Sequence, residues 1–317
     1  MASSSESRPF RFFGEGGTLF GIHIVNLFLA LLTLGIYTFW GRVKIRKYIW
    51  GQIEFEGDRF SYHGTGMETF LGWVKAFFIF GIPYLIFREV PTLAGLSKTL
   101  IFTGAGISVL LILAFIPMAI VGTRRYRMSR TAWRGIRFSF RETWKGYMPI
   151  FWWRGFLRII TLGLYTPFYD ARRDRFLISN TNVGNRRFNY DGQGADLFSN
   201  FFVAWILAFP TLYISLFWYH VVKTRYMWNH TTLDGARFNS TITFGGMFSL
   251  YFINALLVLF TLGFGFPWAE TRTLHYLSFN LTLDGPADLA AIEQDAQSVN
   301  ATGEELSSFL DLDFDLG

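Results

Sequence analysis

The sequence lacks cysteine altogether and has few charged residues. The absence of cysteine from all 317 residues excludes disulfides, thiol catalysis and thiolate metal sites. Charged residues make up 16% of the chain, against roughly 25% in an average soluble domain. The five histidines show no metal-ligand spacing, and neither a phosphate-binding loop nor a nucleophile elbow is present. We therefore expect no metal, no cofactor and no enzymatic activity.

Apolar and aromatic residues are abundant instead. Hydrophobic residues reach 51% and aromatic residues 20% of the chain, which is typical of a membrane protein. A spanning helix needs about 20 mostly apolar residues, and six blocks approach this length. The fourth block is the weakest, because Arg154 and Arg158 interrupt it, and it could instead lie in the membrane interface. The sequence thus predicts a mainly α-helical membrane protein with about six transmembrane helices, at 18–40, 69–87, 100–121, 146–169, 197–219 and 247–268.

A repeat of about fifty residues runs through the chain. Phenylalanines 10, 60, 138, 188 and 238 are separated by 50, 78, 50 and 50 residues, and the long interval contains an inserted hydrophobic block. The motif Thr-Leu-Gly recurs in the same phase at 33–35, 161–163 and 261–263. We interpret residues 10–285 as five tandem repeat units, preceded by a polar segment (1–9) and followed by an acidic tail (286–317) that we expect to be disordered.

Each unit is expected to begin with a short β-hairpin at the membrane surface. The segment 52–64 alternates polar and apolar residues and turns at Glu56-Gly57, and the segments around Phe138 and Phe238 follow the same pattern. A membrane helix and a basic helix complete the unit. Lys and Arg are richest in the runs 42–47 and 124–130, which favours a cytoplasmic location for those runs. The orientation of the termini stays open, because it depends on whether the fourth block crosses.

Several stretches resemble one known family. The stretch NLFLALLTLGIYTFWGRVKIRKYIW, followed by GDRFSYHGTG, RTAWRGIRFSF and TLGLYTPF, is similar to the YjgN family of bacterial inner-membrane proteins. The resemblance covers roughly residues 10–285. It implies a multi-pass protein of the inner membrane, and it assigns no activity, because the family is a domain of unknown function without established catalytic residues.

Polar residues inside the predicted spans are the first candidate sites. Asn26, Arg154 and Asn254 lie sixteen positions after the repeat phenylalanine in units one, three and five. They would form one buried polar site if their helices met, or they could simply join neighbouring helices by hydrogen bonds. Glu68 and Asp196 occupy equal places at helix starts, where a capping role competes with proton coupling.

Arginine-phenylalanine pairs are the second group of candidates. They could bind lipid headgroups, with the guanidinium on phosphate, or could serve only as structural anchors. The run 124–141 has the charge of a nucleic-acid patch, but its interleaved aromatics beside a span indicate an anionic lipid surface instead. The pairs are Arg59-Phe60, Arg137-Phe138, Arg187-Phe188 and Arg237-Phe238.

Three functions remain open from the sequence. Transport of a small solute or ion through the repeat bundle is the preferred hypothesis, by analogy with other repeat-built membrane proteins. The alternative is a non-catalytic envelope protein that binds anionic lipid or organises protein partners, and the third is a membrane enzyme acting on lipid. We expect membrane lipids and an unidentified solute or protein as partners, and no nucleic acid.

Overall fold

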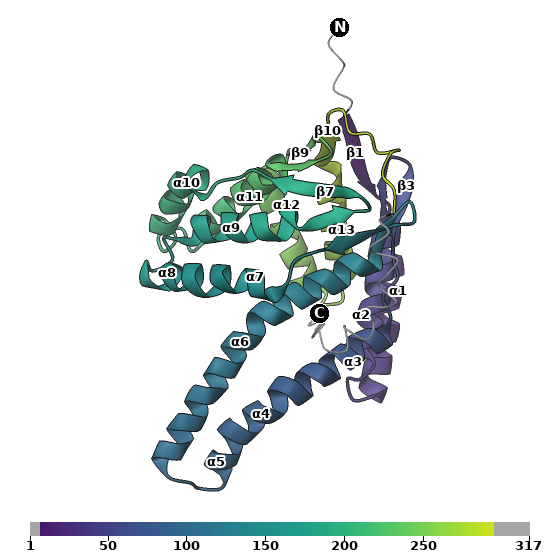
Figure 1. Cartoon of the computed structure of the whole chain (residues 1–317). Helices are drawn as coiled ribbons and strands as arrows, with labels where there is room; N and C mark the ends of the chain where they lie inside the picture. The colour runs from purple at the N-terminus through teal and green to yellow at the C-terminus, as the bar shows by residue number, and fades with distance from the viewer. Residues whose placement is uncertain (1–6, 295–317) are drawn as a thin grey trace.

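Ten short strands close into one antiparallel barrel in the computed structural model, which describes residues 7–294 (Figure 1). Neighbours around the barrel follow the order β1-β10-β9-β8-β7-β6-β5-β4-β3-β2, and β2 pairs with β1 to close it. Closure leaves no free strand edge on which another chain could pair. The strands are β1 (Ser7–Phe12), β2 (Ile53–Phe55), β3 (Asp58–Tyr62), β4 (Thr131–Trp133), β5 (Ile136–Phe140), β6 (Thr181–Val183), β7 (Arg186–Tyr190), β8 (Thr231–Leu233), β9 (Ala236–Ser240) and β10 (Leu281–Asp284).

Tight turns join eight of the ten strands in pairs, as β2–β3, β4–β5, β6–β7 and β8–β9. In the β2–β3 turn, Glu56 and Gly57 both have positive φ, at 54° and 78°. This geometry matches the twist of the flanking strands, and glycine adopts it without steric cost. The β6–β7 turn differs, because Gly184 lies against the backbone of Glu293: a Cβ on Gly184 would come within 2.1 Å of the Glu293 carbonyl oxygen. Glycine at position 184 is therefore required by a close approach of the chain.

All helices leave the same end of the barrel. Because the strands are antiparallel, the tight turns share one end, and the strand ends that lead into helices share the other. The register confirms this, since Tyr62 pairs with Thr131 where the chain enters and leaves a helical hairpin. We call the two ends the turn end and the helical end. The helices are α1 (Gly16–Leu32), α2 (Thr38–Gln52), α3 (Gly66–Ala76), α4 (Ile82–Tyr84), α5 (Val90–Leu93), α6 (Lys98–Arg130), α7 (Trp144–Pro149), α8 (Gly155–Ile160), α9 (Thr166–Ser179), α10 (Gly194–Ile206), α11 (Ile214–Asn229), α12 (Phe244–Phe260) and α13 (Phe266–Phe279), with π-helical turns η1 (Phe77–Gly81), η2 (Leu85–Glu89) and η3 (Ile150–Arg154).

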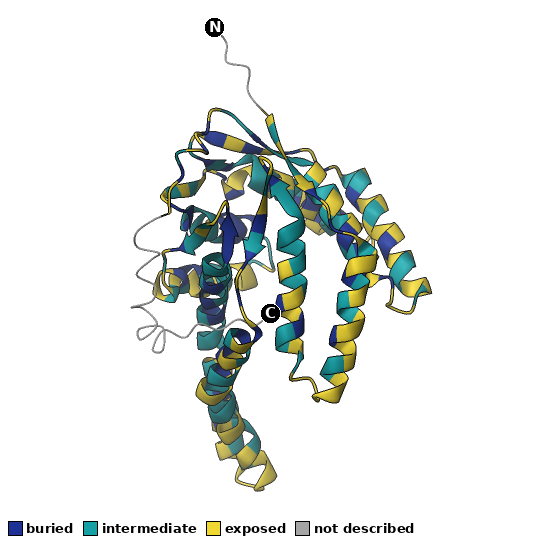
Figure 2. Cartoon of the chain, turned by 90° about the vertical axis from the view of Figure 1, so that its right-hand side faces the viewer, coloured by how far each residue is buried: buried dark blue, intermediate teal, exposed yellow. Residues whose placement is uncertain are grey.

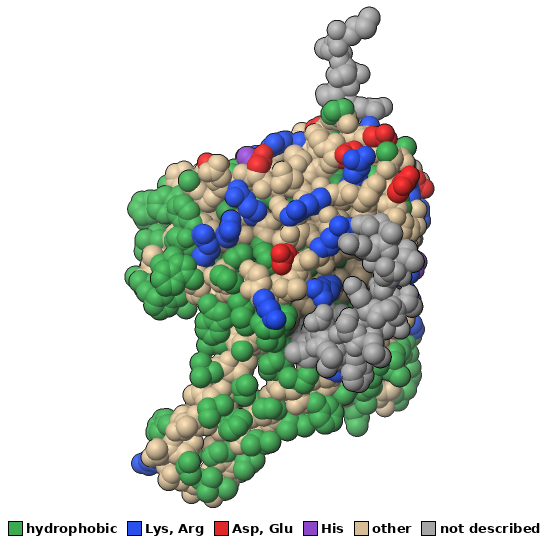
Figure 3. Space-filling view, viewed as in Figure 1, with side chains coloured by type: hydrophobic (Ala, Val, Ile, Leu, Met, Phe, Trp, Pro, Cys, Tyr) green, Lys and Arg blue, Asp and Glu red, His purple; other side chains and the backbone are tan. Residues whose placement is uncertain are grey.

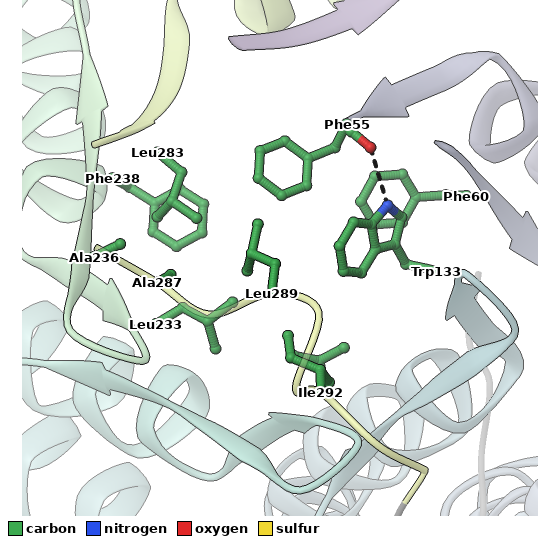
Figure 4. Packing of buried hydrophobic residues seen from close by; sticks show 11 residues of the cluster. Phe55, Phe60, Trp133, Leu233, Ala236, Phe238, Leu283, Ala287, Leu289 and Ile292 are labelled. Carbon is green, nitrogen blue, oxygen red and sulfur yellow. Dashed lines mark hydrogen bonds between the residues drawn. The ribbon is translucent and has the colours of Figure 1, made fainter. Parts of the chain in front are cut away.

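Stacked aromatic rings fill the barrel. Phe138 lies between Phe60 and Phe188, with ring centroids 6.2 and 6.3 Å away, and Phe238 lies between Phe188 and Phe10, each at 6.1 Å. These distances suit attractive aromatic contacts. The indole N–H of Trp133 donates to the Phe55 carbonyl at 3.2 Å, so the one polar group of that side chain is satisfied inside the core (Figure 4).

The segment after β10 completes this core. Ala287, Leu289 and Ile292 are buried against the barrel residues (Figure 4). The segment is held by one backbone and one side-chain acceptor, since Asn185 N–H donates to the Glu293 carbonyl at 3.0 Å and Arg137 N–H donates to Gln294 Oε1 at 2.7 Å. Residues 286–294, which the sequence assigned to the acidic tail, thus form part of the packed barrel. The rest of that predicted tail, 295–317, lies outside the described residues.

The prediction of a mainly helical membrane bundle with about six spans is wrong. Within 7–294, two helices are long and apolar enough to cross a membrane, Gly66–Leu93 and Lys98–Arg130, while α1 and α12 are shorter apolar helices. The hairpins expected as separate surface elements instead pair with one another in one closed barrel. The fold is therefore a barrel with helical hairpins attached to one end.

Turns inside the hydrophobic blocks explain this correction. The block 18–40 contains the turn between α1 and α2, and the blocks at 146–169, 197–219 and 247–268 are broken in the same way. A window of apolar residues cannot distinguish one long helix from two shorter helices joined by an apolar turn. On these helices, exposed residues are most frequent toward the ends that lie away from the barrel (Figure 2).

Candidate functional site

An arginine-lined pocket lies where α7 and η3 meet α9 and β7. Its volume is about 830 Å³, and Lys and Arg side chains gather on this face of the molecule (Figure 3). Four arginines and one glutamate line it. The lining residues are Glu142, Gly146, Pro149, Ile150, Trp153, Arg154, Arg172, Arg175, Phe176, Ser179, Asn180, Arg187, Asn189 and Tyr190.

The arginines reach the pocket from three elements. Arg172 and Arg175 are three residues apart on α9, so they share one face of that helix. Arg154 ends the π-helical turn η3, which directly follows Pro149. Proline lacks the N–H that a regular helix needs, and such widened turns often occur at functional sites. Arg187 projects from strand β7.

These four arginines form no salt bridge with any carboxylate of residues 7–294. Arg154 Nη1 donates to the Tyr165 hydroxyl at 2.9 Å, and Arg175 Nη2 donates to the Gly192 carbonyl at 3.2 Å. Arg187 donates to the Ser179 carbonyl and, at 2.9 Å, to Asn180 Oδ1. Neutral partners hold Arg154, Arg175 and Arg187 in place without cancelling their charge, so the pocket keeps an excess of positive charge.

A buried ionic cluster fixes α9 behind the pocket. Asp170 accepts from Lys223 Nζ at 2.6 Å and lies 3.3 Å from Arg173, which also binds Asp174 at 2.8 Å. Burial lowers the pKa of Arg173, but the two carboxylates outweigh burial and raise the pKa overall. Asp170 and Asp174 are thus bound by Lys223 and Arg173, and within the described residues they form no salt bridge with the pocket arginines.

Comparison with known proteins identifies the family of the chain. A family described as bacterial proteins of unknown function, DUF898, matches residues 7–217 and 206–309. The chain belongs to the DUF898 family. It is also similar to proteins named inner membrane protein YjgN, which confirms the expected family resemblance and a location in the bacterial inner membrane. No solved structure matches the chain.

The relatives are longer than the matched region. The YjgN protein of Escherichia coli (strain K12) is 33% identical over 170 residues, covering 53% of this chain and 39% of the relative. The protein of Escherichia coli O157:H7 is 37% identical over 179 residues, covering 56% and 42%, and that of Salmonella typhimurium is 32% identical over 161 residues, covering 50% and 37%. The match therefore spans about two fifths of each relative's length.

The polar residues expected inside the spans of this DUF898 protein each bond within their own helical hairpin. Asn26 Nδ2 donates to the Gly41 carbonyl at 3.1 Å, and Asn254 Nδ2 donates to the Ala269 carbonyl at 3.1 Å. Arg154 bonds to Tyr165 and lines the pocket. No hydrogen bond within the described range joins any two of the three residues. A shared polar site is therefore not formed by direct contact.

Glu68 and Asp196 sit at the bases of helical hairpins. Glu68 completes a capping box with Thr65 and also binds Arg130 and the Tyr126 hydroxyl, which joins α3 to α6. Asp196 accepts from the Tyr226 hydroxyl, and burial together with this bond raises the pKa of Tyr226 to about 12. Asp196 also lines a second, smaller pocket of about 280 Å³ with Tyr226 and His230.

The arginine-phenylalanine pairs place their two side chains differently. The four phenylalanines belong to the barrel core, where Phe60 and Phe238 are buried and Phe138 and Phe188 are partly buried. The arginines lie on the other face of each strand, and three of them are held: Arg59 by Gln52, Arg187 by Asn180, and Arg237 by Asp191. Contact with lipid headgroups stays a prediction, and it is sterically available to the outward-facing arginines.

Sequence reasoning missed Arg172 and Arg175. Both lie in the run DARRDR at 170–175, which the sequence analysis did not single out as a site. The spacing of three residues on a helix was the available signal. Their convergence with Arg154 and Arg187 depends on packing between α9, η3 and β7, which no local pattern encodes.

Proposed function

We propose that this inner-membrane protein binds the phosphate of anionic lipid headgroups in the arginine-lined pocket. The observation that carries the proposal is a pocket lined by four arginines that form no salt bridge with a carboxylate of residues 7–294. Guanidinium groups bind phosphate oxygens through charge-assisted hydrogen bonds, and basic pockets between membrane-associated helices suit lipid headgroups.

The surroundings of the pocket favour a lipid over a free anion. Trp153 lines the pocket and is exposed, and the exposed side chains of Phe156, Ile159 and Ile160 continue from it along α8. An acyl chain could lie on this apolar surface while its phosphate occupied the pocket. A free phosphate ion would use the arginines alone, so the two ligands are separable by experiment.

Transport of a small solute is the competing proposal. It requires polar groups along one path, and Asn26, Arg154 and Asn254 are instead engaged in three separate hairpins. We therefore place lipid binding first. If transport is the activity, then Asn26→Leu, Arg154→Leu and Asn254→Leu combined should abolish flux of potassium or phosphate into reconstituted vesicles.

Native mass spectrometry of the full chain in neutral detergent tests lipid binding. Short-chain phosphatidylglycerol should bind more tightly than phosphatidylcholine or inorganic phosphate. The variant Arg172→Gln/Arg175→Gln should weaken phosphatidylglycerol binding by roughly 10–50-fold, at about 1 kcal/mol per basic residue.

A charge-matched control is available in the same chain. Arg225 follows Arg175 by fifty positions and Arg272 follows Arg172 by one hundred, and neither lines the arginine-lined pocket. Arg225→Gln/Arg272→Gln removes the same charge and should leave affinity almost unchanged. Equal losses in the two double variants would mean that only overall charge matters, and the pocket proposal would be abandoned. Equal affinity for phosphatidylglycerol and inorganic phosphate would reassign the pocket to a free anion.

A further inference from the structure

Four of the helical hairpins end in the same apolar turn. The turns join α1 to α2, α8 to α9, α10 to α11 and α12 to α13. Each has a leucine with positive φ at its tip, and these leucines are among the most exposed apolar side chains of the described residues. They are Leu34 (94% exposed), Leu162 (77%), Leu212 (82%) and Leu262 (88%).

The backbone of each turn is closed by hydrogen bonds. In the first turn, Gly35 N–H donates to the Ala30 carbonyl at 2.7 Å, and Tyr37 N–H donates to Thr33 Oγ1 at 2.9 Å. The same threonine hydroxyl donates back to the Leu29 carbonyl at 2.8 Å. Thr161, Thr211 and Thr261 repeat this double role in the other three turns. A turn whose amide groups are satisfied internally can enter hydrocarbon without leaving unpaired donors.

Polar residues return eight positions after each tip, and eight positions before three of the four tips. The residues eight positions after the tip leucines are Arg42, Asp170, His220 and Glu270. The residues eight positions before the tip leucines are Asn26, Arg154, Ala204 and Asn254, of which only Ala204 is apolar. The two sides are level, because Asn26 bonds to the carbonyl of Gly41 beside Arg42, and Asn254 bonds to that of Ala269 beside Glu270.

This distance is too short for the tips to cross a bilayer. Eight residues of helix rise about 12 Å, whereas the hydrocarbon core is about 30 Å thick. If the polar level lies at the headgroups, each tip therefore stays within one leaflet. The polar positions that the sequence placed in mid-span would then mark the membrane surface.

The long hairpin from α3 to α6 behaves differently. Its two helices cover Gly66–Leu93 and Lys98–Arg130, long enough to cross, and its tip carries Arg88, Glu89 and Lys98. A charged tip suits water on the far side of the membrane, and an uncharged tip suits hydrocarbon. Of the 29 Lys and Arg residues of the chain, two, Arg88 and Lys98, lie at this far tip. By the positive-inside rule, this distribution favours a barrel on the cytoplasmic side.

We propose that the four short hairpins dip into the leaflet next to the barrel and return, and that only the long hairpin crosses the membrane. Their partners are the acyl chains of that leaflet. The hairpins would surround the barrel as a one-sided anchor, with the barrel and the ends of residues 7–294 on the same side. This inference depends on the inner-membrane location and is independent of the lipid-binding pocket.

Single cysteines test the topology directly, because the chain has none of its own. Leu34→Cys and Leu262→Cys report on two tips, Ala94→Cys on the far end of the long hairpin, and Arg11→Cys on the barrel. A membrane-impermeant maleimide is applied to spheroplasts and to inside-out vesicles. Ile36→Cys, which is exposed in the same turn without positive φ, replaces Leu34→Cys if that variant does not accumulate.

We expect the tip cysteines to give at most about a tenth of the labelling seen after SDS denaturation, from either side. Ala94→Cys should label in spheroplasts and Arg11→Cys in inside-out vesicles. Labelling of a tip from the Ala94 side would mean that the short hairpin crosses, and labelling from the Arg11 side would mean that it lies in water. Either result would overturn the inference, whatever the outcome of the lipid-binding measurement.

Discussion

Glu68 should stabilise the base of the long hairpin from α3 to α6 more than Asp196 stabilises the base of the hairpin formed by α10 and α11. Glu68 accepts hydrogen bonds from Thr65 N–H at 3.1 Å, the Tyr126 hydroxyl at 2.9 Å, and Arg130 Nε and Nη2 at 3.2 and 2.9 Å. Asp196 binds the hydroxyl of Tyr226, and the N-cap of its helix makes no side-chain hydrogen bond. The matched perturbations are Glu68→Gln and Asp196→Asn, which remove the charge and keep the shape.

The expected magnitude follows from these contacts. The Glu68 and Arg130 side chains are 35% and 31% exposed, so solvent screening reduces their ion pair to at most about 1 kcal/mol. Glutamine keeps the capping contact with Thr65 N–H, so the further loss comes from the weaker hydrogen bond that a neutral oxygen accepts from the Tyr126 hydroxyl, about 0.5–1 kcal/mol. We therefore expect Glu68→Gln to cost about 1–2 kcal/mol of the free energy of unfolding, and Asp196→Asn to cost about 0.5–1 kcal/mol for one hydrogen bond.

Thermal unfolding of the full chain in a neutral detergent measures this difference. A loss of 1–2 kcal/mol should lower the melting temperature by roughly 2–5 °C. The double variant Glu68→Gln/Arg130→Gln should lose less than the sum of the single variants, because both remove one interaction. A melting temperature unchanged by Glu68→Gln, or an equal or larger drop for Asp196→Asn, would refute a structural role for Glu68 and favour the proton-coupling alternative.

Three further predictions concern the barrel and the turns. Phe238→Ala should lower the free energy of unfolding by about 3–5 kcal/mol, because Phe238 is buried between stacked rings. Phe279→Ala, at an 83% exposed position, should change it by less than about 0.5 kcal/mol. Equal melting temperatures of the two variants would contradict the assignment of Phe238 to the core. Gly35→Ala should destabilise the protein by about 1 kcal/mol, because Gly35 has a φ of 90°. Gly21→Ala, inside α1, should stabilise it by a similar amount. Unfolding in detergent should therefore show melting temperatures that shift in opposite directions for the two variants. Burial raises the pKa of Asp191, but hydrogen bonds from Arg237 and His230 outweigh burial and lower it below its ordinary value of 3.8. Because the folded-state pKa is depressed, the stabilisation is present above pH 3.8 and is lost as the pH falls further, so the stability gap between wild type and Asp191→Asn should narrow there; a gap independent of pH would contradict this.

Part of the fold and of the site could be predicted from local patterns. The tight turns at Gly57, Gly135 and Gly235 followed from glycine spacing, because few residues adopt positive φ without strain. The number of spans could not be predicted in this way, because the apolar blocks contain turns whose polar backbone atoms are satisfied by a threonine such as Thr33. Such a turn leaves no polar signature in a hydropathy window. The arginines of the pocket were visible individually, but their meeting depended on three elements packing together.

The sequence by itself determined the membrane class of this DUF898 protein and the fifty-residue spacing of its phenylalanines. Composition and periodicity are properties of the chain, and they need no knowledge of which segments touch. Only the tertiary structure decided that the strands close into a barrel, because closure depends on pairs as distant as Ser7 and Asp284. It also decided that four arginines share one pocket and that Asn26 and Asn254 lie level with the residues eight positions beyond the tips of their hairpins. Local patterns cannot encode these arrangements, since their free energy arises from contacts between segments far apart in the chain.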